Sequence, residues 1–277
     1  MAANVPPYFD SMILAYHRGE IGRFVHLGHW DAPRQISTPV TPPEFARAQA
    51  RLNDALMRMA GITDGMSVID IGCGFGGTIE QLNICHSALQ ITGVNIDPRQ
   101  LEVCCLINPC NQNQIIWQEA DACKLPFASS SVDRVLCIEA MFHFSSRRKF
   151  LIESARLLKP GGVMVATDIV VDWPKVAQHP HATGIATTLV REFGPWPELC
   201  FAATQFHALA DESGLQCETL YDASLNTAPS HDFVAPGPSQ LSVDDSGRVV
   251  SAANCLKFMQ SIGGLKYVYL KFTKPES

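Results

Sequence analysis

The sequence predicts an α/β fold in which a doubly wound sheet carries helices on both faces. Short apolar strand-like segments alternate with helical segments between residues 67 and 168. A glycine-rich turn joins the first of these strands to the helix that follows it. The chain has 277 residues, a length that suits one α/β domain with added segments.

The N-terminal part is predicted to be a helical unit that precedes this core. Residues 8–60 are helical by pattern and contain the unusual string Val25-His-Leu-Gly-His-Trp30. We therefore divide the single structural domain into an N-terminal unit, residues 1–60, and a core, residues 61–277.

The first core strand leads into the turn that carries most of the functional information. Val68 to Ile71 form a short, mostly apolar strand with an acid, Asp70, near its end. The glycines of the turn follow at Gly72, Gly74, Gly76 and Gly77. Backbone N–H groups in such a turn can approach a ligand closely. The sequence therefore predicts a nucleotide-type cofactor site near residue 70.

This turn is compatible with two kinds of cofactor. Gly72, Gly74 and Gly77 match G-x-G-x-x-G, the fingerprint of dinucleotide enzymes. The same stretch, from Asp70 to Gly76, also matches acid-x-Gly-x-Gly-x-Gly. An acid at the strand end attracts an ammonium group and repels a pyrophosphate, which favours the second interpretation.

The second strand is predicted at Gln90 to Asp97, and Pro98 opens the helix after it. In a doubly wound sheet the end of this strand lies beside the ribose of a bound nucleoside, where Asn95 and Asp97 offer polar groups. Asp97 also suits the N-cap of the following helix, and we favour that role.

The remaining elements follow from periodicity and from turn residues. Val132 and Asp133 lead into the fourth strand, the helix Arg148–Leu158 ends at Lys159-Pro-Gly-Gly162, and Val163–Ala166 form a buried strand that ends at Thr167-Asp168. Insertions are predicted at residues 172–204 and 226–259. A helix at Phe206–Ser213 and a strand at Gln216–Tyr221 lie between them. Asn226–Ser246 is predicted as loop, Val249–Met259 as helix and Leu265–Phe272 as the final strand.

The order of these motifs resembles that of the class I methyltransferases that use S-adenosylmethionine. The resemblance rests on the acid–glycine turn, the second strand end, the turn at Asp121-Ala122 and the string Arg156-Leu-Leu-Lys-Pro-Gly-Gly162. It is similar to the small-molecule branch, which includes natural-product, sterol and tocopherol enzymes. It implies a seven-stranded, Rossmann-like methyltransferase fold with an antiparallel last strand.

The resemblance also implies which residues bind the cofactor, S-adenosylmethionine. Asp121 would accept a hydrogen bond from the adenine amino group, and the Ala122 N–H would meet a ring nitrogen. Asn95 stands where many relatives have an acid, and Gln100 would help to hold the ribose, as in the branch with cyclopropane synthases. The full expected set is Asp70, Gly72, Cys73, Gly74, Gly76, Asn95, Ile96, Gln100, Asp121, Ala122 and Glu139.

In similar enzymes the N-terminal helices fold over cofactor and substrate as a lid, and aromatic insertions complete an enclosed, mostly apolar pocket. We expect residues 1–60 to form such a lid and the insertions at 172–204 and 226–259 to bind substrate. Packing inside the core is the alternative role for His29 and Trp30. The expected lid and acceptor residues are Tyr8, Tyr16, His29, Trp30, Trp173 and Trp196.

For catalysis, the resemblance points to His143 as a base for a hydroxyl acceptor, with Asp168 orienting it or the substrate. O-methylation of a small molecule in specialised metabolism is the leading function. Glu139 would instead be the base in a C-methyltransferase acting on an isoprenoid or another activated carbon. An NAD-dependent oxidoreductase and a non-methylating cyclase or binding protein stay open as alternatives.

Composition and charge indicate which kinds of partner and which location this protein has. The net charge of −6 and the pI of about 5.8 argue against a nucleic-acid substrate. No apolar run reaches membrane-spanning length, and the N-terminus lacks the features of a signal peptide. The ten cysteines are scattered without metal-site spacing, which predicts reduced thiols and a cytoplasmic location. We expect a partly apolar small-molecule acceptor and no metal, and a homodimer is the candidate assembly.

Overall fold

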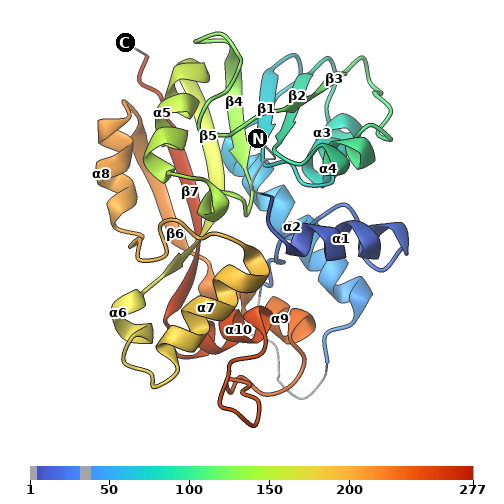
Figure 1. Ribbon diagram of the computed structural model, residues 1–277. Coiled ribbons are helices and arrows are strands. Elements are labelled where there is room, and N and C mark those ends of the chain that lie inside the picture. The colour runs from blue at the N-terminus through green and yellow to red at the C-terminus, as the bar shows by residue number, and fades with distance from the viewer. Residues whose placement is uncertain (1–4, 32–38, 277) are drawn as a thin grey trace.

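The computed structural model describes residues 5–31 and 39–276, and it contains the predicted α/β fold (Figure 1). Its seven strands form one sheet in the order β3-β2-β1-β4-β5-β7-β6. β7 pairs antiparallel with both β5 and β6, as the resemblance implied. The strands are β1 (Ser67–Ile71), β2 (Gln90–Asn95), β3 (Gln114–Glu119), β4 (Val132–Cys137), β5 (Leu158–Val171), β6 (Gln216–Asp222) and β7 (Leu265–Thr273).

The position of the site follows from the strand order. β1 is central and pairs in parallel with β2 on one side and β4 on the other. The chain reverses its direction of winding between these pairs, and in such sheets ligands bind outside the carboxyl ends of the strands at that point. The structure therefore places a crevice where the turn after β1 meets the end of β4.

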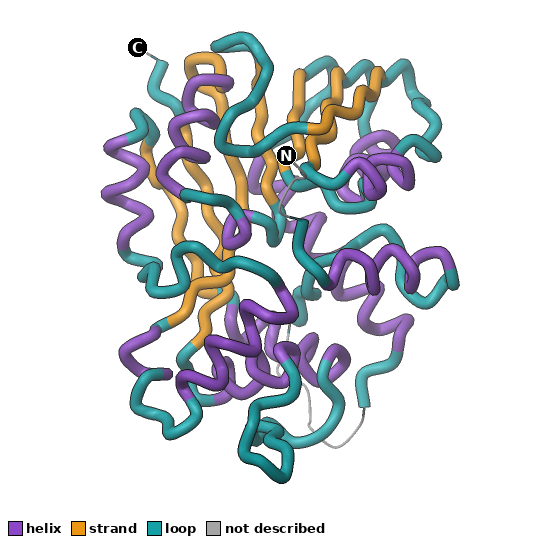
Figure 2. Tube along the Cα trace, in the orientation of Figure 1, coloured by secondary structure: helices purple, strands orange, loops and turns teal. Residues whose placement is uncertain are grey.

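Helices and one short 3-10 turn, η1, surround the sheet (Figure 2). They are α1 (Tyr8–His17), α2 (Pro42–Ala60), α3 (Gly77–Cys85), α4 (Pro98–Cys104), η1 (Met141–His143), α5 (Arg147–Leu157), α6 (Trp173–Val176), α7 (Ala182–Phe193), α8 (Gln205–Glu212), α9 (Ser224–Val234) and α10 (Ala252–Ser261).

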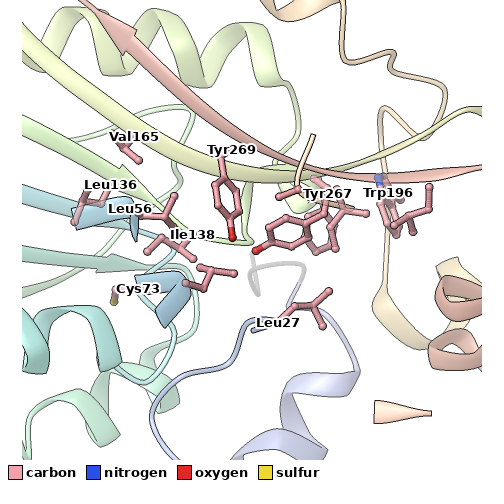
Figure 3. Packing of buried hydrophobic residues seen from close by; sticks show 14 of the residues in the cluster. Leu27, Leu56, Cys73, Leu136, Ile138, Val165, Trp196, Tyr267 and Tyr269 are labelled. Atoms are coloured by element: carbon pink, nitrogen blue, oxygen red, sulfur yellow. The ribbon is translucent and has the colours of Figure 1, made fainter. Parts of the chain in front are cut away.

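Alternating side chains on the central strands build two cores, one on each face of the sheet. On β5, Met164 packs in one core and Val165 in the other, both fully buried. On β7, Tyr267 packs in the core of Val165 and Phe272 in the core of Met164. Figure 3 shows the core of Val165, in which the rings of Tyr267 and Tyr269 lie near Leu27 and Ile138.

Local signals explain where several helices begin and end. Thr41 and Glu44 form a capping box on α2, and Gly61 ends that helix in a left-handed conformation with φ 59°. Asp97 accepts a hydrogen bond of 3.0 Å from the Arg99 N–H, so the predicted N-cap of α4 is present. Ser146 caps α5 in the same manner.

The expectation of loop at Asn226–Ser246 is wrong for its first part, because α9 covers Ser224–Val234. Polar side chains on this helix face inward. Ser230 is fully buried, and its Oγ accepts hydrogen bonds from the Gly28 N–H and the Trp30 indole. The inward face is therefore not apolar, and the composition concealed the helix.

The N-terminal unit is also less helical than predicted. α1 and α2 are separated by residues 18–41. Residues 18–31 and 39–41 form no helix, and residues 32–38 lie outside the described residues. The string Val25–Trp30 runs as an extended segment along the core, with the Trp30 N–H donating to the Asn226 carbonyl at 2.9 Å.

Candidate functional site

The turn after β1 requires glycine for two separate physical reasons. Gly72 and Gly74 have φ of +77° and +54°, a region that favours glycine. A Cβ on Gly72 would lie 2.4 Å from the Ala140 Cβ, and one on Gly74 would lie 2.7 Å from a Val25 methyl. The Gly72 and Cys73 N–H groups donate to the Val94 carbonyl, which ties the turn to β2.

A cavity of about 580 Å³ opens beside this turn, at the carboxyl ends of β1, β2 and β4. It combines residues predicted separately as cofactor, catalytic and lid residues. From those predictions its lining contains Gly72, Gly74, Asn95, Ile96, Gln100, Asp121, Ala122, Glu139, His143 and Tyr8. Its volume lies within the range of pockets that enclose small ligands.

Asp70 and Cys73 line a smaller space of about 20 Å³, which shares Gly72 with the large cavity. The Asp70 carboxylate is 2 % exposed and accepts no hydrogen bond from the residues that the structure describes. Burial raises the pKa of Asp70 to about 7. A buried carboxylate without a partner is costly, so this position suits a cationic ligand group such as the ammonium of S-adenosylmethionine.

The predicted ribose residues are already in contact with each other. The Asn95 amide donates to Gln100 Oε1 at 2.9 Å, and its oxygen accepts from the Ile96 N–H at 2.8 Å. Gln100 is buried, and its Nε2 donates to none of the described residues. Because that amide lines the cavity, it is available as a donor to a sugar hydroxyl.

At the predicted adenine end, Asp121 and Ala122 both line the cavity. Asp121 is exposed, and its carboxylate accepts from the Cys123 N–H at 2.8 Å, so it also caps a turn. Gly76 lies outside the lining and instead begins α3 with φ of +78°.

Glu139 joins three distant parts of the chain at the end of β4. Its Oε2 accepts hydrogen bonds of 2.8 Å from the Leu27 N–H and from the Tyr267 hydroxyl. Its own N–H donates to Thr167 Oγ1. Burial raises the pKa of Glu139 to about 7, against the two hydrogen bonds that lower it. Its backbone has φ 54°, an unusual value for a residue with a side chain.

His143 lies on η1 and contacts the N-terminal helix. Its Nε2 is 3.0 Å from the hydroxyl oxygen of Tyr8, whereas its Nδ1 is buried and has no hydrogen-bond partner among the residues described. Burial lowers the pKa of His143 to about 4, so the imidazole is neutral at physiological pH.

The prediction that Asp168 orients His143 is wrong. Asp168 is fully buried outside the cavity lining, and its carboxylate accepts from Arg147 Nε at 2.6 Å and from the Ile169 N–H. Arg147 also contacts Glu198, at 3.3 Å. The acid therefore neutralises a buried guanidinium that could not be recognised from the strand end alone.

The expected lid and acceptor residues separate into two groups. Tyr8 lines the cavity, but the others pack elsewhere. Tyr16 packs on Phe75, His29 contacts the Tyr269 hydroxyl, Trp30 donates to Ser230, Trp173 packs against the core and Trp196 stacks on Phe142. None of these five residues lines the cavity, so the prediction that they contact the acceptor there is wrong. His29 and Trp30 take the packing role that was their alternative, and Tyr16 remains part of the proposed lid helix α1.

The lining also contains side chains that were not among the predicted site residues: Phe9, Met12, Val25, Phe144, Pro195 and Pro197. Pro195 and Pro197 flank Trp196. The sequence therefore predicted the correct segment of the lining, but the side chains that line the cavity are the two prolines and not Trp196. Leu27 and Tyr267 hold Glu139. Leu27 belongs to the unusual string Val25–Trp30, but nothing in that string indicated this contact, and Tyr267 carries no motif. Only the chain's path brings them to β4.

Within the described ranges, no group of three or more His, Cys, Asp or Glu side chains gathers as a metal site. The same ranges contain no helix long and apolar enough to cross a membrane.

A sheet of this order with a glycine turn and a cavity at its switch point defines a nucleotide-cofactor enzyme. Residues 69–166 match the family described as "Methyltransferase domain". The chain is 31 % identical to the O-methyltransferase cnsE of Penicillium expansum, over 88 % of this chain and 83 % of that protein. It is 30 % identical to methyltransferase GfsG of Streptomyces halstedii, over 76 % of this chain and 73 % of that protein.

The fold agrees. The crystal structure of the [4+2]-cyclase SpnF matches with a TM-score of 0.69 at 19 % identity, over 100 % of this chain and 99 % of that one. The chain belongs to the class I S-adenosylmethionine-dependent methyltransferases, in the branch that acts on small molecules. Its cofactor is S-adenosylmethionine, which when bound supplies an electrophilic methyl group on a sulfonium. The dinucleotide interpretation of the glycine turn is thereby set aside.

Proposed function

We propose that this enzyme methylates a hydroxyl oxygen of a partly apolar, uncharged small molecule in specialised metabolism. The observation that carries the proposal is the acceptor side of the cavity. It pairs an imidazole and a phenol, His143 and Tyr8, with the apolar side chains of Phe9, Met12 and Phe144. The described lining contains no lysine or arginine, so nothing there neutralises a diphosphate or another strong anion.

The relatives support the same chemistry. The similar Penicillium expansum protein is named an O-methyltransferase, and its alignment covers most of both chains. A neutral hydroxyl is a weak nucleophile, so a neutral imidazole beside the cavity gives the site a proton acceptor. We assign that role to His143 and the cofactor contacts to the cavity residues that the resemblance implied.

C-methylation is a second candidate because of one observation. Glu139 lines the cavity, and burial raises its pKa to about 7, which suits a carboxylate that removes a proton after a carbon is methylated. Its Oε2 is engaged by two donors, but its other oxygen accepts from none of the described residues.

Two further predictions concern the protein as a whole. We propose a cytoplasmic location, supported by ten free cysteines within the described residues. A homodimer stays a prediction, and light scattering of the purified protein tests it.

Methyl-labelled S-adenosylmethionine and a panel of phenols, alcohols, amines and enolisable carbonyl compounds test the proposed function. We expect label in an O-methyl ether. Label in a new carbon–carbon bond, lost in Glu139→Gln, establishes the second candidate instead. Tight binding of S-adenosylhomocysteine with no transfer to any class would contradict both and indicate a non-methylating protein.

A further inference from the structure

We propose that Tyr8 is a catalytic residue that relays the acceptor's proton to His143. The inference rests on the O-methylation proposed above and adds the path of the proton. The sequence predicted Tyr8 as a lid or acceptor-contact residue, and the structure gives its hydroxyl a specific hydrogen-bond partner in the cavity lining, His143.

The first step of the argument is that the imidazole of His143 is enclosed by rings. The ring centroid of Phe142 lies 4.1 Å away, that of Tyr8 5.7 Å and that of Phe9 6.4 Å. Nδ1 is buried without a hydrogen-bond partner, and Nε2 contacts the Tyr8 hydroxyl at 3.0 Å. His143 lines the cavity, but its Nε2 is already engaged by the Tyr8 hydroxyl, so the proton of an acceptor in the cavity reaches Nε2 through that hydroxyl.

The second step is that Tyr8 has the capacity and the position for a relay. A phenol hydroxyl donates one hydrogen bond and accepts others, and that of Tyr8 contacts no described residue except His143. Its ring is fixed edge-on between Phe9 at 4.8 Å and Phe193 at 5.3 Å. Tyr8 lines the same cavity as Gly72 and Gly74, so its hydroxyl shares one space with the cofactor turn.

The third step concerns the starting protonation state. Burial lowers the pKa of His143 to about 4, which leaves the imidazole neutral. Burial, and next the charge of Glu139, raise the pKa of Tyr8 above its usual range, which keeps the phenol protonated. Because a tyrosinate is disfavoured here, Tyr8 must release its own proton as it takes up the acceptor's.

The step balances in atoms and charge. The acceptor O–H bond breaks and its proton passes to Tyr8 Oη, while the Tyr8 proton passes to His143 Nε2. The acceptor oxygen bonds to the methyl carbon as the carbon–sulfur bond breaks. The positive charge lost at sulfur is gained by the His143 imidazolium, which later returns its proton to solvent.

The direction of the hydrogen bond can be measured without turnover. We would record ¹⁵N spectra of histidine-labelled protein with S-adenosylhomocysteine and no acceptor. The relay requires an unprotonated Nε2 that accepts from Tyr8, and Tyr8→Phe should shift that resonance. Tyr16→Phe is the matched control, because Tyr16 is on the same helix and its hydroxyl bonds to none of the described residues. A proton on Nε2 with a bare Nδ1 overturns the proposal.

Single-turnover rates with the ether-forming acceptor found in the panel complete the test. Tyr8→Phe should slow transfer by on the order of 10²–10³-fold with cofactor affinity unchanged, as His143→Ala should. The double variant should be no slower than the slower single variant, because the two groups act as a unit. A Tyr8→Phe rate above half of wild type, or losses that multiply, overturns the relay but leaves O-methylation intact. No ether from the wild-type enzyme overturns the proposed function itself.

Discussion

At the scale of single residues, the cofactor turn depends on Gly74, where two constraints coincide. Its φ of +54° disfavours any side chain, and an added Cβ would meet a Val25 methyl at 2.7 Å on the edge of the cavity. Gly74→Val should therefore abolish binding of S-adenosylhomocysteine in calorimetry. Gly65→Val is the control, because Gly65 has φ of +81° and open space around its Cβ position. Micromolar binding retained by Gly74→Val would argue against this turn as the cofactor site.

Asp70 should make both stability and cofactor binding depend on pH. Its pKa is about 7 in the folded protein and near the ordinary ~3.9 in the unfolded chain, so the folded state binds the extra proton between these values. Stability of the cofactor-free protein should fall as pH rises from 4 to 7. Affinity for the cationic cofactor should rise as the carboxylate ionises.

Asp70→Asn separates these two effects. Because Asn stays neutral, the stability of the variant should not fall between pH 4 and pH 7. At pH 8 its free energy of unfolding in urea should exceed that of wild type by up to a few kcal/mol. It should also bind cofactor more weakly and with less pH dependence. An affinity that stays as high as wild type at pH 8 would show that the carboxylate does not meet the ammonium group.

At the scale of elements, the buried ion pair of Arg147 and Asp168 joins the start of α5 to β5. Arg147 also binds Glu198, next to the prolines that line the cavity, and its guanidinium lies 4.7 Å from the Phe201 ring. Each charge is at most 1 % exposed, so removing Asp168 leaves a buried guanidinium with only its longer contact to the partly exposed Glu198.

Asp168→Asn should therefore destabilise the fold by on the order of 3 kcal/mol in urea unfolding. Glu212→Gln is the control, because it breaks an exposed ion pair with Arg148 and should cost less than about 1 kcal/mol. If Asp168→Asn instead kept its stability and lost only methyl transfer, the original expectation of a catalytic acid would be restored.

At the scale of the whole molecule, the N-terminal unit divides into a fixed segment and a weakly anchored helix. Residues 26–28 are buried, and the Leu27 N–H donates to Glu139. α1 has no buried residue, and it contacts the core through the rings of Tyr8, Phe9 and Tyr16 and through an ion pair between Asp10 and Arg99. We propose that α1 is the moving part of the lid.

Hydrogen exchange should locate this motion. Amides of residues 8–17 should exchange fast in the free protein and slow when S-adenosylhomocysteine and acceptor are both bound. Residues 26–28 should be protected in both states. Equal protection of α1 with and without ligands would make it a static cap.

Sequence alone predicted the seven-stranded sheet, the glycine turn and the residues expected to bind the cofactor. These residues follow the ends of consecutive strands, so their spacing along the chain is enough to predict that they lie together. Gly72, Gly74 and Asn95 are examples, and all three line the cavity. Only the tertiary structure decided the acceptor half. Tyr8 meets His143 across 135 positions, and Glu139 meets Tyr267 across 128. Such contacts depend on how helices and strands pack, and no local pattern encodes them. For the same reason Asp168, at a predicted catalytic position, proved to be the partner of Arg147.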